Sequence, residues 1–171
     1  MDFTAQEVID HLDLKPLSFE GGYYKETYLS KDRVKLEEFA DRYDAHEFRS
    51  MLSAIYYLLT PETYSRLHRL PTDEIFHFYM GDPVEMVTIN SISKVEIIKI
   101  GNQLEQGCQP QVVIPQHTWQ GSRLVSGGKF ALMGTTMSPA FAEKDFESAA
   151  LNPEFLNGIS PKYKDLIQSL L

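Results

Sequence analysis

Two histidines and two adjacent acids lie within one short stretch, HRLPTDEIFHFYMG at residues 68–81. A histidine changes its charge near neutral pH, and a carboxylate beside it can exchange a proton with a substrate. The same groups can also hold a metal ion. His68, Glu74 and His77 are therefore the first candidates for chemistry, as metal ligands, as an acid–base pair, or as the lining of a pocket.

The spacing of these candidates limits how they can meet. The run EIFHFYM predicts a β-strand, and alternate side chains of a strand point to the same face. Glu74 then shares a face with Phe76, whereas His77 shares the other face with Tyr79. Only a bulge would aim Glu74 and His77 into one cavity. His68 falls on the preceding strand and could approach either face.

The elements around this stretch are predominantly strands. Short runs rich in β-branched and aromatic residues are bounded by Gly, Pro, Asn or Asp: YYKETYL, SAIYYLLT, EIFHFYM, VEMVTI, KVEIIKI, PQVVIP and FALMGTTM. With no helices between them, they predict an antiparallel sandwich or barrel. Short helices are expected at both ends, because Thr4 and Glu7 form a capping box and Ser160 precedes Pro161. Residues 31–49 predict a solvated loop or short helix.

Composition restricts the class of protein. The chain has 171 residues, 43% of them hydrophobic, and a formal net charge of −8 without a Lys/Arg cluster. A single globular domain over residues 1–171 is expected, with neither a nucleic acid nor a membrane as partner. The acidic N-terminus does not resemble a secretory signal, and Cys108, the only cysteine, excludes an internal disulfide. We expect a cytoplasmic protein.

Two segments resemble the cupin motifs. In the first motif two histidines flank one residue and are followed by a glutamate and a glycine. His68 matches the second histidine, Glu74 the glutamate and Gly81 the glycine, while Arg66 replaces the first histidine. The second motif resembles PQHTWQ, where Gln120 stands in place of a metal-binding histidine.

The departures from these motifs bear on metal binding. Arginine cannot ligate a divalent cation and glutamine is a weak ligand, so we expect no cofactor. The gap from His68 to Glu74 is one residue longer than usual, and Asp73 is the alternative inward-facing residue. If His77 joined His68 and Glu74, a divalent metal could still be held.

Most of the chain is similar to the cupin 5 group. The segments EGGYYKETY, SAIYYLL, HRLPTDEIFHFYMGDPVEM, QVVIPQHTWQ and LMGTTMSPAFAEKDFE follow in the same order, from roughly residue 5 to residue 150. The resemblance implies a mainly β cupin double-stranded β-helix, a jelly-roll barrel, with short flanking helices. The fold would be like that of dTDP-4-dehydrorhamnose 3,5-epimerase, whose site uses no metal. It also implies a homodimer.

The resulting functional hypothesis is a small-molecule-binding cupin. It would carry out metal-independent, isomerase- or epimerase-type proton transfer on a polar, anionic or sugar-like ligand, with His68 as base and Tyr79 or Tyr57 as acid. One alternative is a metal-dependent dioxygenase or lyase using His68, Glu74 and His77. The other is a ligand-binding module without turnover.

Further residues are candidates for ligand contact. Arg66 and Arg69 flank His68, and a guanidinium could clasp a carboxylate or phosphate through its forked donors. Trp119 could stack on a ring or pack in the core. Gln111 and Gln120 could supply neutral hydrogen bonds.

Overall fold

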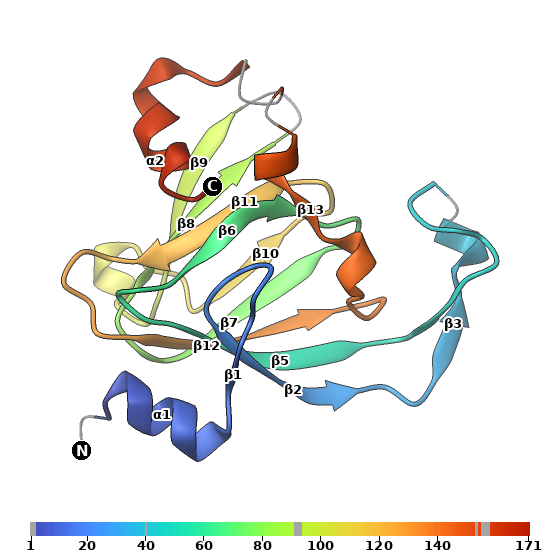
Figure 1. Cartoon of the computed structure of the whole chain (residues 1–171), viewed down its shortest axis with the longest axis horizontal. Helices are drawn as coiled ribbons and strands as arrows, with labels where there is room; N and C mark the ends of the chain where they lie inside the picture. The colour runs from blue at the N-terminus through green and yellow to red at the C-terminus, as the bar shows by residue number, and fades with distance from the viewer. Residues whose placement is uncertain (1–2, 40, 91–93, 153, 155–157) are drawn as a thin grey trace.

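Two antiparallel sheets face each other in the computed structural model, which describes residues 3–39, 41–90, 94–152, 154 and 158–171 (Figure 1). The larger sheet has the order β1 (Lys15–Pro16), β2 (Tyr23–Leu29), β5 (Ser53–Leu59), β12 (Ala131–Met137), β7 (Glu74–Gly81) and β10 (Gln111–Ile114). The smaller has the order β13 (Glu147–Ser148), β6 (Tyr64–Arg69), β11 (Trp119–Leu124), β8 (Val84–Ile89) and β9 (Val95–Ile100). The predicted mainly β barrel is confirmed.

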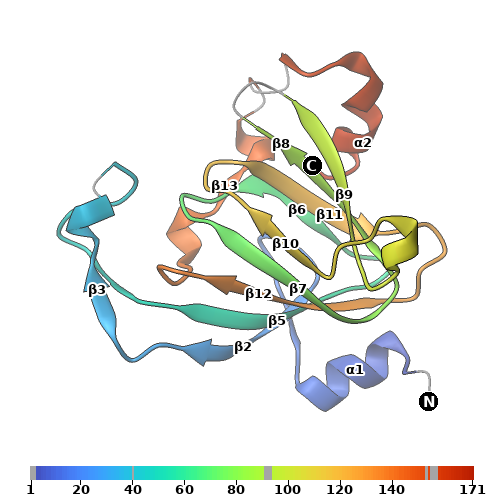
Figure 2. The ribbon, with the colours of Figure 1, turned by 180° about the vertical axis from the view of Figure 1, so that it is seen from behind.

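Helices flank the two sheets on opposite sides (Figures 1 and 2). Helix α1 (Ala5–Leu12) packs on the outer face of the larger sheet, with Val8 buried against Leu132. Helix α2 (Lys164–Gln168) packs on the outer face of the smaller sheet, where Ile167 joins Trp119 in one apolar cluster. The short flanking helices predicted from the sequence are present at both ends.

The two helix starts differ from each other. At α1 the capping box is confirmed: Thr4 Oγ1 accepts from the backbone N–H of Glu7 at 3.2 Å, and Glu7 Oε2 accepts from the N–H of Thr4 at 2.8 Å. Near the C-terminus, Ser160 makes no capping hydrogen bond. A 3-10 turn, η6 (Pro161–Tyr163), opens that helix instead and continues into α2.

The segment at residues 31–49 is more structured than the sequence predicted. It holds the paired strands β3 (Arg33–Lys35) and β4 (Phe48–Ser50), with the 3-10 turn η1 (Leu36–Phe39) between them. Further 3-10 turns are η2 (Leu104–Gln106), η3 (Glu143–Asp145) and η4 (Ala149–Leu151). Within the described ranges, no helix is long and apolar enough to cross a membrane.

The space between the sheets is filled mainly by apolar side chains. Tyr57, Phe76, Met86 and Met133 belong to this inner core, and each is at least 98% buried. Towards one end of the barrel the apolar filling gives way to polar and titratable groups. These groups form the candidate site.

Candidate functional site

Three polar side chains meet between the sheets. His68 on β6 is 1% exposed and Glu74 on β7 is 7% exposed. Gln120, paired in register with His68, donates from Nε2 to Glu74 Oε2 at 2.8 Å. Asp73 is exposed and accepts from the backbone N–H of Gln116 at 2.8 Å. Glu74, rather than Asp73, is therefore the inward-facing acid.

The hydrogen bonds of His68 fix its tautomer. Nδ1 lies 2.7 Å from the carbonyl oxygen of Arg66, and a carbonyl can only accept, so Nδ1 carries the proton and Nε2 keeps its lone pair. Burial lowers the pKa of His68, and the neighbouring Glu74 carboxylate opposes that shift without reversing it. The imidazole is therefore neutral at pH 7.

Burial has the opposite consequence for Glu74. Burial first, and the charge of Glu20 second, raise the pKa of the carboxyl from 4.5 to about 7, while His68, Thr135 and Gln120 act against the shift. A group with this pKa exists in both protonation states near neutral pH. That is the property of a residue that exchanges protons with a ligand.

Glu20 is a second buried acid that the sequence analysis did not select. It lies in the loop between β1 and β2, and Ser65 Oγ donates to its Oε1 at 2.7 Å. Part of the Glu20 residue is exposed to solvent, but its carboxyl group is buried. Burial raises the pKa of Glu20 to about 7, against the hydrogen bond from Ser65 that lowers it. Glu20 and Glu74 thus form an interacting pair of carboxyls.

The backbone of Gly21 holds the Glu20 loop against β6. Gly21 has φ +108°, and a Cβ there would lie 2.1 Å from the carbonyl oxygen of Tyr64. Its own carbonyl accepts from the Tyr57 hydroxyl at 3.0 Å. Only glycine permits both this dihedral angle and this approach.

We expect Gly21→Ala to destabilise the protein by roughly 1–3 kcal/mol, because strain at positive φ is combined with a backbone clash. Gly127→Ala is the matched control: Gly127 has φ +82° but nothing within 4 Å of the added Cβ. Urea unfolding of both variants separates the two costs. Equal destabilisation would show that the close approach to Tyr64 is unimportant.

The two carboxyls line a cavity of about 220 Å³. Glu26 and Glu143 also line the cavity. Both are exposed, so the wall is acidic at its solvent-facing end as well. The rings of Phe19, Tyr24 and Phe141 form much of the rest. The described part of this wall contains no lysine, arginine or histidine. The cavity is therefore acidic and partly aromatic.

Residues 143–148, here called the cover segment, lie against His68. The cover segment runs from the larger sheet to the smaller one, where β13 pairs with β6. Within it, the Phe146 ring stacks on the His68 ring with centroids 4.6 Å apart and an angle of 21° between the planes. Phe146 also meets Phe19 edge-on at 5.0 Å. His68 is thus sealed behind an aromatic ring.

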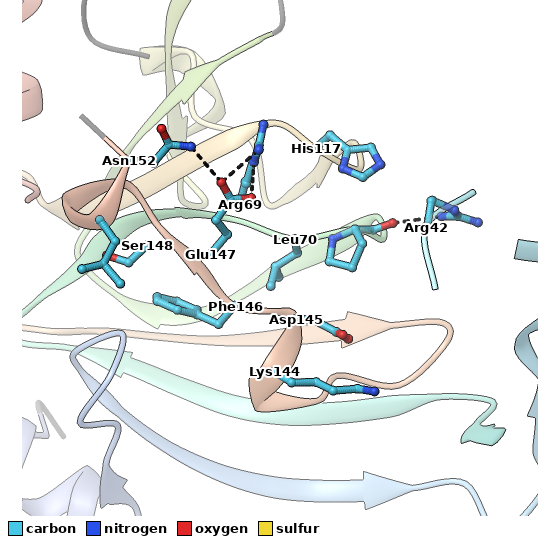
Figure 3. Close-up of a pocket in the computed structure, with 12 residues that line it drawn as sticks. Arg42, Arg69, Leu70, His117, Lys144, Asp145, Phe146, Glu147, Ser148 and Asn152 are labelled. Atoms are coloured by element: carbon cyan, nitrogen blue, oxygen red, sulfur yellow. Dashed lines mark hydrogen bonds and ion pairs between the residues drawn. The ribbon is translucent and has the colours of Figure 1, made fainter. Parts of the chain in front are cut away.

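On its other side the cover segment borders an open cleft of about 660 Å³ (Figure 3). Arg42, Arg69 and Lys144 bring positive charge to this cleft. Much of that charge is already neutralised, since Arg69 makes a two-pronged pair with Glu147 at 2.6 and 2.9 Å. The Arg69 guanidinium is therefore not available to bind an anion in the cleft.

Three of the predicted site residues lie elsewhere. His77, Tyr79 and Gln111 are on the outer face of the larger sheet, where Gln111 Nε2 lies 3.2 Å from His77 Nδ1 and Thr136 Oγ1 lies 3.3 Å from Nε2. A bulge does occur in β7, but at Tyr79, beyond both candidates, so it leaves His77 pointing away from Glu74. The structure does not bring these residues to the cavity.

The predicted ligand-binding arginines are occupied by their own chain. Arg66 donates to the carbonyls of residues 18–19 at 2.9 and 3.2 Å, which places it beside the Glu20 loop. Arg69 lies over the Trp119 ring at 4.7 Å and pairs with Glu147. Trp119 is 5% exposed and belongs to the cluster under the C-terminal helix. None of the three lines the acidic cavity.

The donor set does not fit a resident metal ion. Of the four motif positions, Arg66 is turned to the Glu20 loop, and the amide of Gln120 donates to Glu74, so it approaches that carboxylate as a donor rather than as a second ligand. Across residues 3–39, 41–90, 94–152, 154 and 158–171, no three His, Cys, Asp or Glu side chains gather closely enough to hold a metal.

Two facing sheets with His68, Glu74 and Gln120 between them define a cupin barrel. The family model Cupin_5, described as "Cupin superfamily (DUF985)", matches residues 6–149. The chain therefore belongs to the Cupin_5 family of cupins.

Solved structures agree with this assignment. Protein SO0799 from Shewanella oneidensis is 29% identical, covers 99% of this chain and 98% of its own, and superposes with a TM-score of 0.82. A hypothetical protein from Leishmania major is 28% identical, covers 92% of this chain and 97% of its own, and superposes with a TM-score of 0.77. Bacillus subtilis oxalate decarboxylase, which has Mn(II) centres, shares the fold alone, at 14% identity over 99% of this chain and 39% of its own, with a TM-score of 0.52. No curated protein matches the chain.

Proposed function

We propose that this cupin binds a small polar molecule in the acidic cavity and transfers protons to and from it without a metal. The observation that carries the proposal is the pair of buried carboxyls, Glu20 and Glu74, in the wall of one cavity, each with its pKa raised to about 7. Pairs of interacting acids with pKa values near the working pH are a recurrent arrangement for acid–base catalysis.

The pair supplies one base and one acid at the same time. Near pH 7 repulsion between the two carboxylates favours a state with a single shared charge. The ionised carboxylate takes a proton from a carbon next to a carbonyl, and the electron pair of the broken C–H bond moves into an enolate. The protonated carboxyl then returns a proton to that carbon from its own side. The carbon changes configuration, and the two carboxyls have exchanged roles.

Neighbouring groups affect how readily Glu20 and Glu74 exchange protons. A neutral His68 behind Glu74 stabilises the carboxylate less than an imidazolium would, which keeps the pKa of Glu74 near 7. Tyr57 is a poor acid here, because burial and Glu20 raise its pKa well above 10 and its hydroxyl donates to Gly21. Glu20 therefore takes the role expected for Tyr57 or Tyr79.

The walls argue against the anionic ligand expected from the sequence. Four glutamates line the cavity. Oxalate, named in the Bacillus subtilis neighbour, is a dianion that such a wall would repel, so we do not extend that activity to this chain. Binding without turnover is the second candidate. It is supported by the position of His68, which does not line the cavity and whose ring is covered by Phe146.

The experiment is a melting-temperature screen of small polar carbonyl compounds, followed by incubation of each hit in D2O. Ligands that bind only the folded state raise its melting temperature. Catalysed proton transfer replaces hydrogen by deuterium at one carbon, which proton NMR detects. We expect Glu74→Gln to slow this exchange by about 10²–10⁴-fold while the ligand still binds.

Glu20→Gln should have a similar effect, and Glu62→Gln, at an exposed position outside the cavity, should have none. Hits that stabilise the protein but keep all their hydrogens would favour binding without turnover. Exchange that survives in both the Glu20 and Glu74 variants would refute the assignment of these residues.

A further inference from the structure

We propose that the cavity selects ligands that carry a primary ammonium group on a small apolar body. This inference rests on the proposed function and names the chemical class of its ligand. It is carried by two features of the cavity wall: its carboxyl groups match an ammonium group, and its aromatic rings match an apolar body.

The charged groups of the wall are all acidic. Glu20 and Glu74 lie at its buried end, and Glu26 and Glu143 lie where it is exposed. The nearby cations do not neutralise them: Arg66 donates to the carbonyls of residues 18–19. The potential inside is therefore negative, and it draws cations from solvent towards the buried pair.

Gln120 holds the Glu74 carboxylate from behind the cavity. Its side chain is 2% exposed, donates from Nε2 to Glu74 Oε2 at 2.8 Å and does not line the cavity. An ammonium has three donors and no acceptor, so it can bind the two carboxyls of the wall together.

The remaining wall suits an apolar body. Phe19 and Phe141 stack with centroids 6.0 Å apart and their planes at 10°, and Tyr24 lies in the same wall. Aromatic faces attract a cation and pack against hydrocarbon equally well. The volume of about 220 Å³ would hold on the order of seven water molecules, so it fits a single ring with a short arm.

The test uses three probes of one shape and different charge: benzylamine, benzyl alcohol and benzoate. Binding is measured by calorimetry at pH 8, where the amine is charged and the carboxyls are mostly ionised. We expect benzylamine to bind at least about tenfold more tightly than benzyl alcohol, since a charge-assisted hydrogen bond replaces a neutral one, and benzoate not to bind.

The variants assign this preference to the pair. Glu74→Gln and Glu20→Gln should each weaken benzylamine about tenfold and leave benzyl alcohol unchanged, and Glu62→Gln should change neither. A preference for benzoate or benzyl alcohol, no binding of benzylamine up to its solubility, or unchanged benzylamine affinity in both variants would overturn the inference.

The outcome is separable from that of the proposed function. Deuterium exchange into a neutral hit, together with no preference for the amine, would leave proton transfer standing and remove the ligand class. Selective amine binding without exchange in any amine-containing hit would keep the ligand class and remove the chemistry.

Discussion

Glu74→Gln is expected to raise the melting temperature strongly at pH 8 and only slightly at pH 5. The folded-state pKa of Glu74, about 7, lies above its ordinary 4.5. Folding therefore favours the protonated form, and the associated stability is present below pH 4.5 and lost as pH rises through 7. At pH 8 the folded protein carries a buried carboxylate that glutamine lacks.

The expected size of this effect is large. A shift from 4.5 to about 7 corresponds to about 3 kcal/mol, or roughly 6–12 °C in melting temperature for a chain of this length. Calorimetric melting at pH 5, 6, 7 and 8 measures it as the difference between variant and wild type. Glu62→Gln should show no such pH-dependent difference. Identical melting temperatures for Glu74→Gln and wild type at pH 8 would mean that the carboxyl is not held in a poorly solvated site.

His68 contributes with the opposite sign. Its pKa is lowered from 6.5, so the stability it provides is present above pH 6.5 and lost as pH falls through the folded-state pKa. The acids therefore destabilise the fold on the alkaline side and the imidazole does so on the acidic side. Wild-type stability should be greatest in mildly acidic solution, and comparing variants at each pH isolates Glu74 from His68.

The sequence predicted the strands whose side chains alternate. The two rows of β7 follow from period-2 spacing, which correctly assigned Glu74 to the face of Phe76 and His77 to the other face. Strand β11 was not predicted, because WQGSRL has no apolar alternation. Its strand state comes from pairing with both β6 and β8, a tertiary contact that local pattern does not encode.

Only part of the candidate site could be predicted from the sequence. His68 and Glu74 were found by the types and spacing of their residues, whereas Glu20 lies 54 positions before Glu74 in a loop. What brings Glu20 inside is the approach of Gly21 to Tyr64, which depends on the folded position of β6. The one local signal was an acid directly before Gly21-Gly22, a pair that permits unusual backbone angles.

The two arginines predicted to contact a ligand do not line the acidic cavity, for a different physical reason. A guanidinium near a site is available to a ligand only if its own chain leaves it unpaired. Arg69 is paired with Glu147, a residue 78 positions away, and Arg66 with backbone carbonyls of the Glu20 loop. Such long-range partners cannot be read from residue types, so sequence reasoning overestimated the positive charge at the site.

Arg49→Met is expected to destabilise the protein by about 3–5 kcal/mol, since it removes one partner of a buried ion pair. The Arg49 side chain is 7% exposed and that of Asp145 is 8% exposed, with Nη1 and Oδ2 2.6 Å apart. Glu47 accepts from the same guanidinium at 2.6 Å but also holds Lys144. In the variant Asp145 loses the buried cation with which it pairs. Urea unfolding measures the cost.

Two further variants identify the source of this cost. Arg33→Met removes an exposed arginine from the paired strand, where it donates only to the carbonyl of Phe48, and should cost under about 1 kcal/mol. Adding Asp145→Asn to Arg49→Met should recover part of the loss, because it removes the stranded charge. No recovery in the double variant would assign the cost to lost packing instead.

The same change links stability to access to the site. Asp145 belongs to the cover segment, and the next residue, Phe146, stacks on His68. Releasing Asp145 should therefore increase amide hydrogen exchange across residues 143–148 in Arg49→Met more than in Arg33→Met. If the cover segment loosens in this way, His68 becomes reachable from the open cleft that Phe146 lines. Unchanged exchange there would show that the Arg69–Glu147 pair, the pairing of β13 with β6 and the Phe146 contacts hold the cover segment without Arg49.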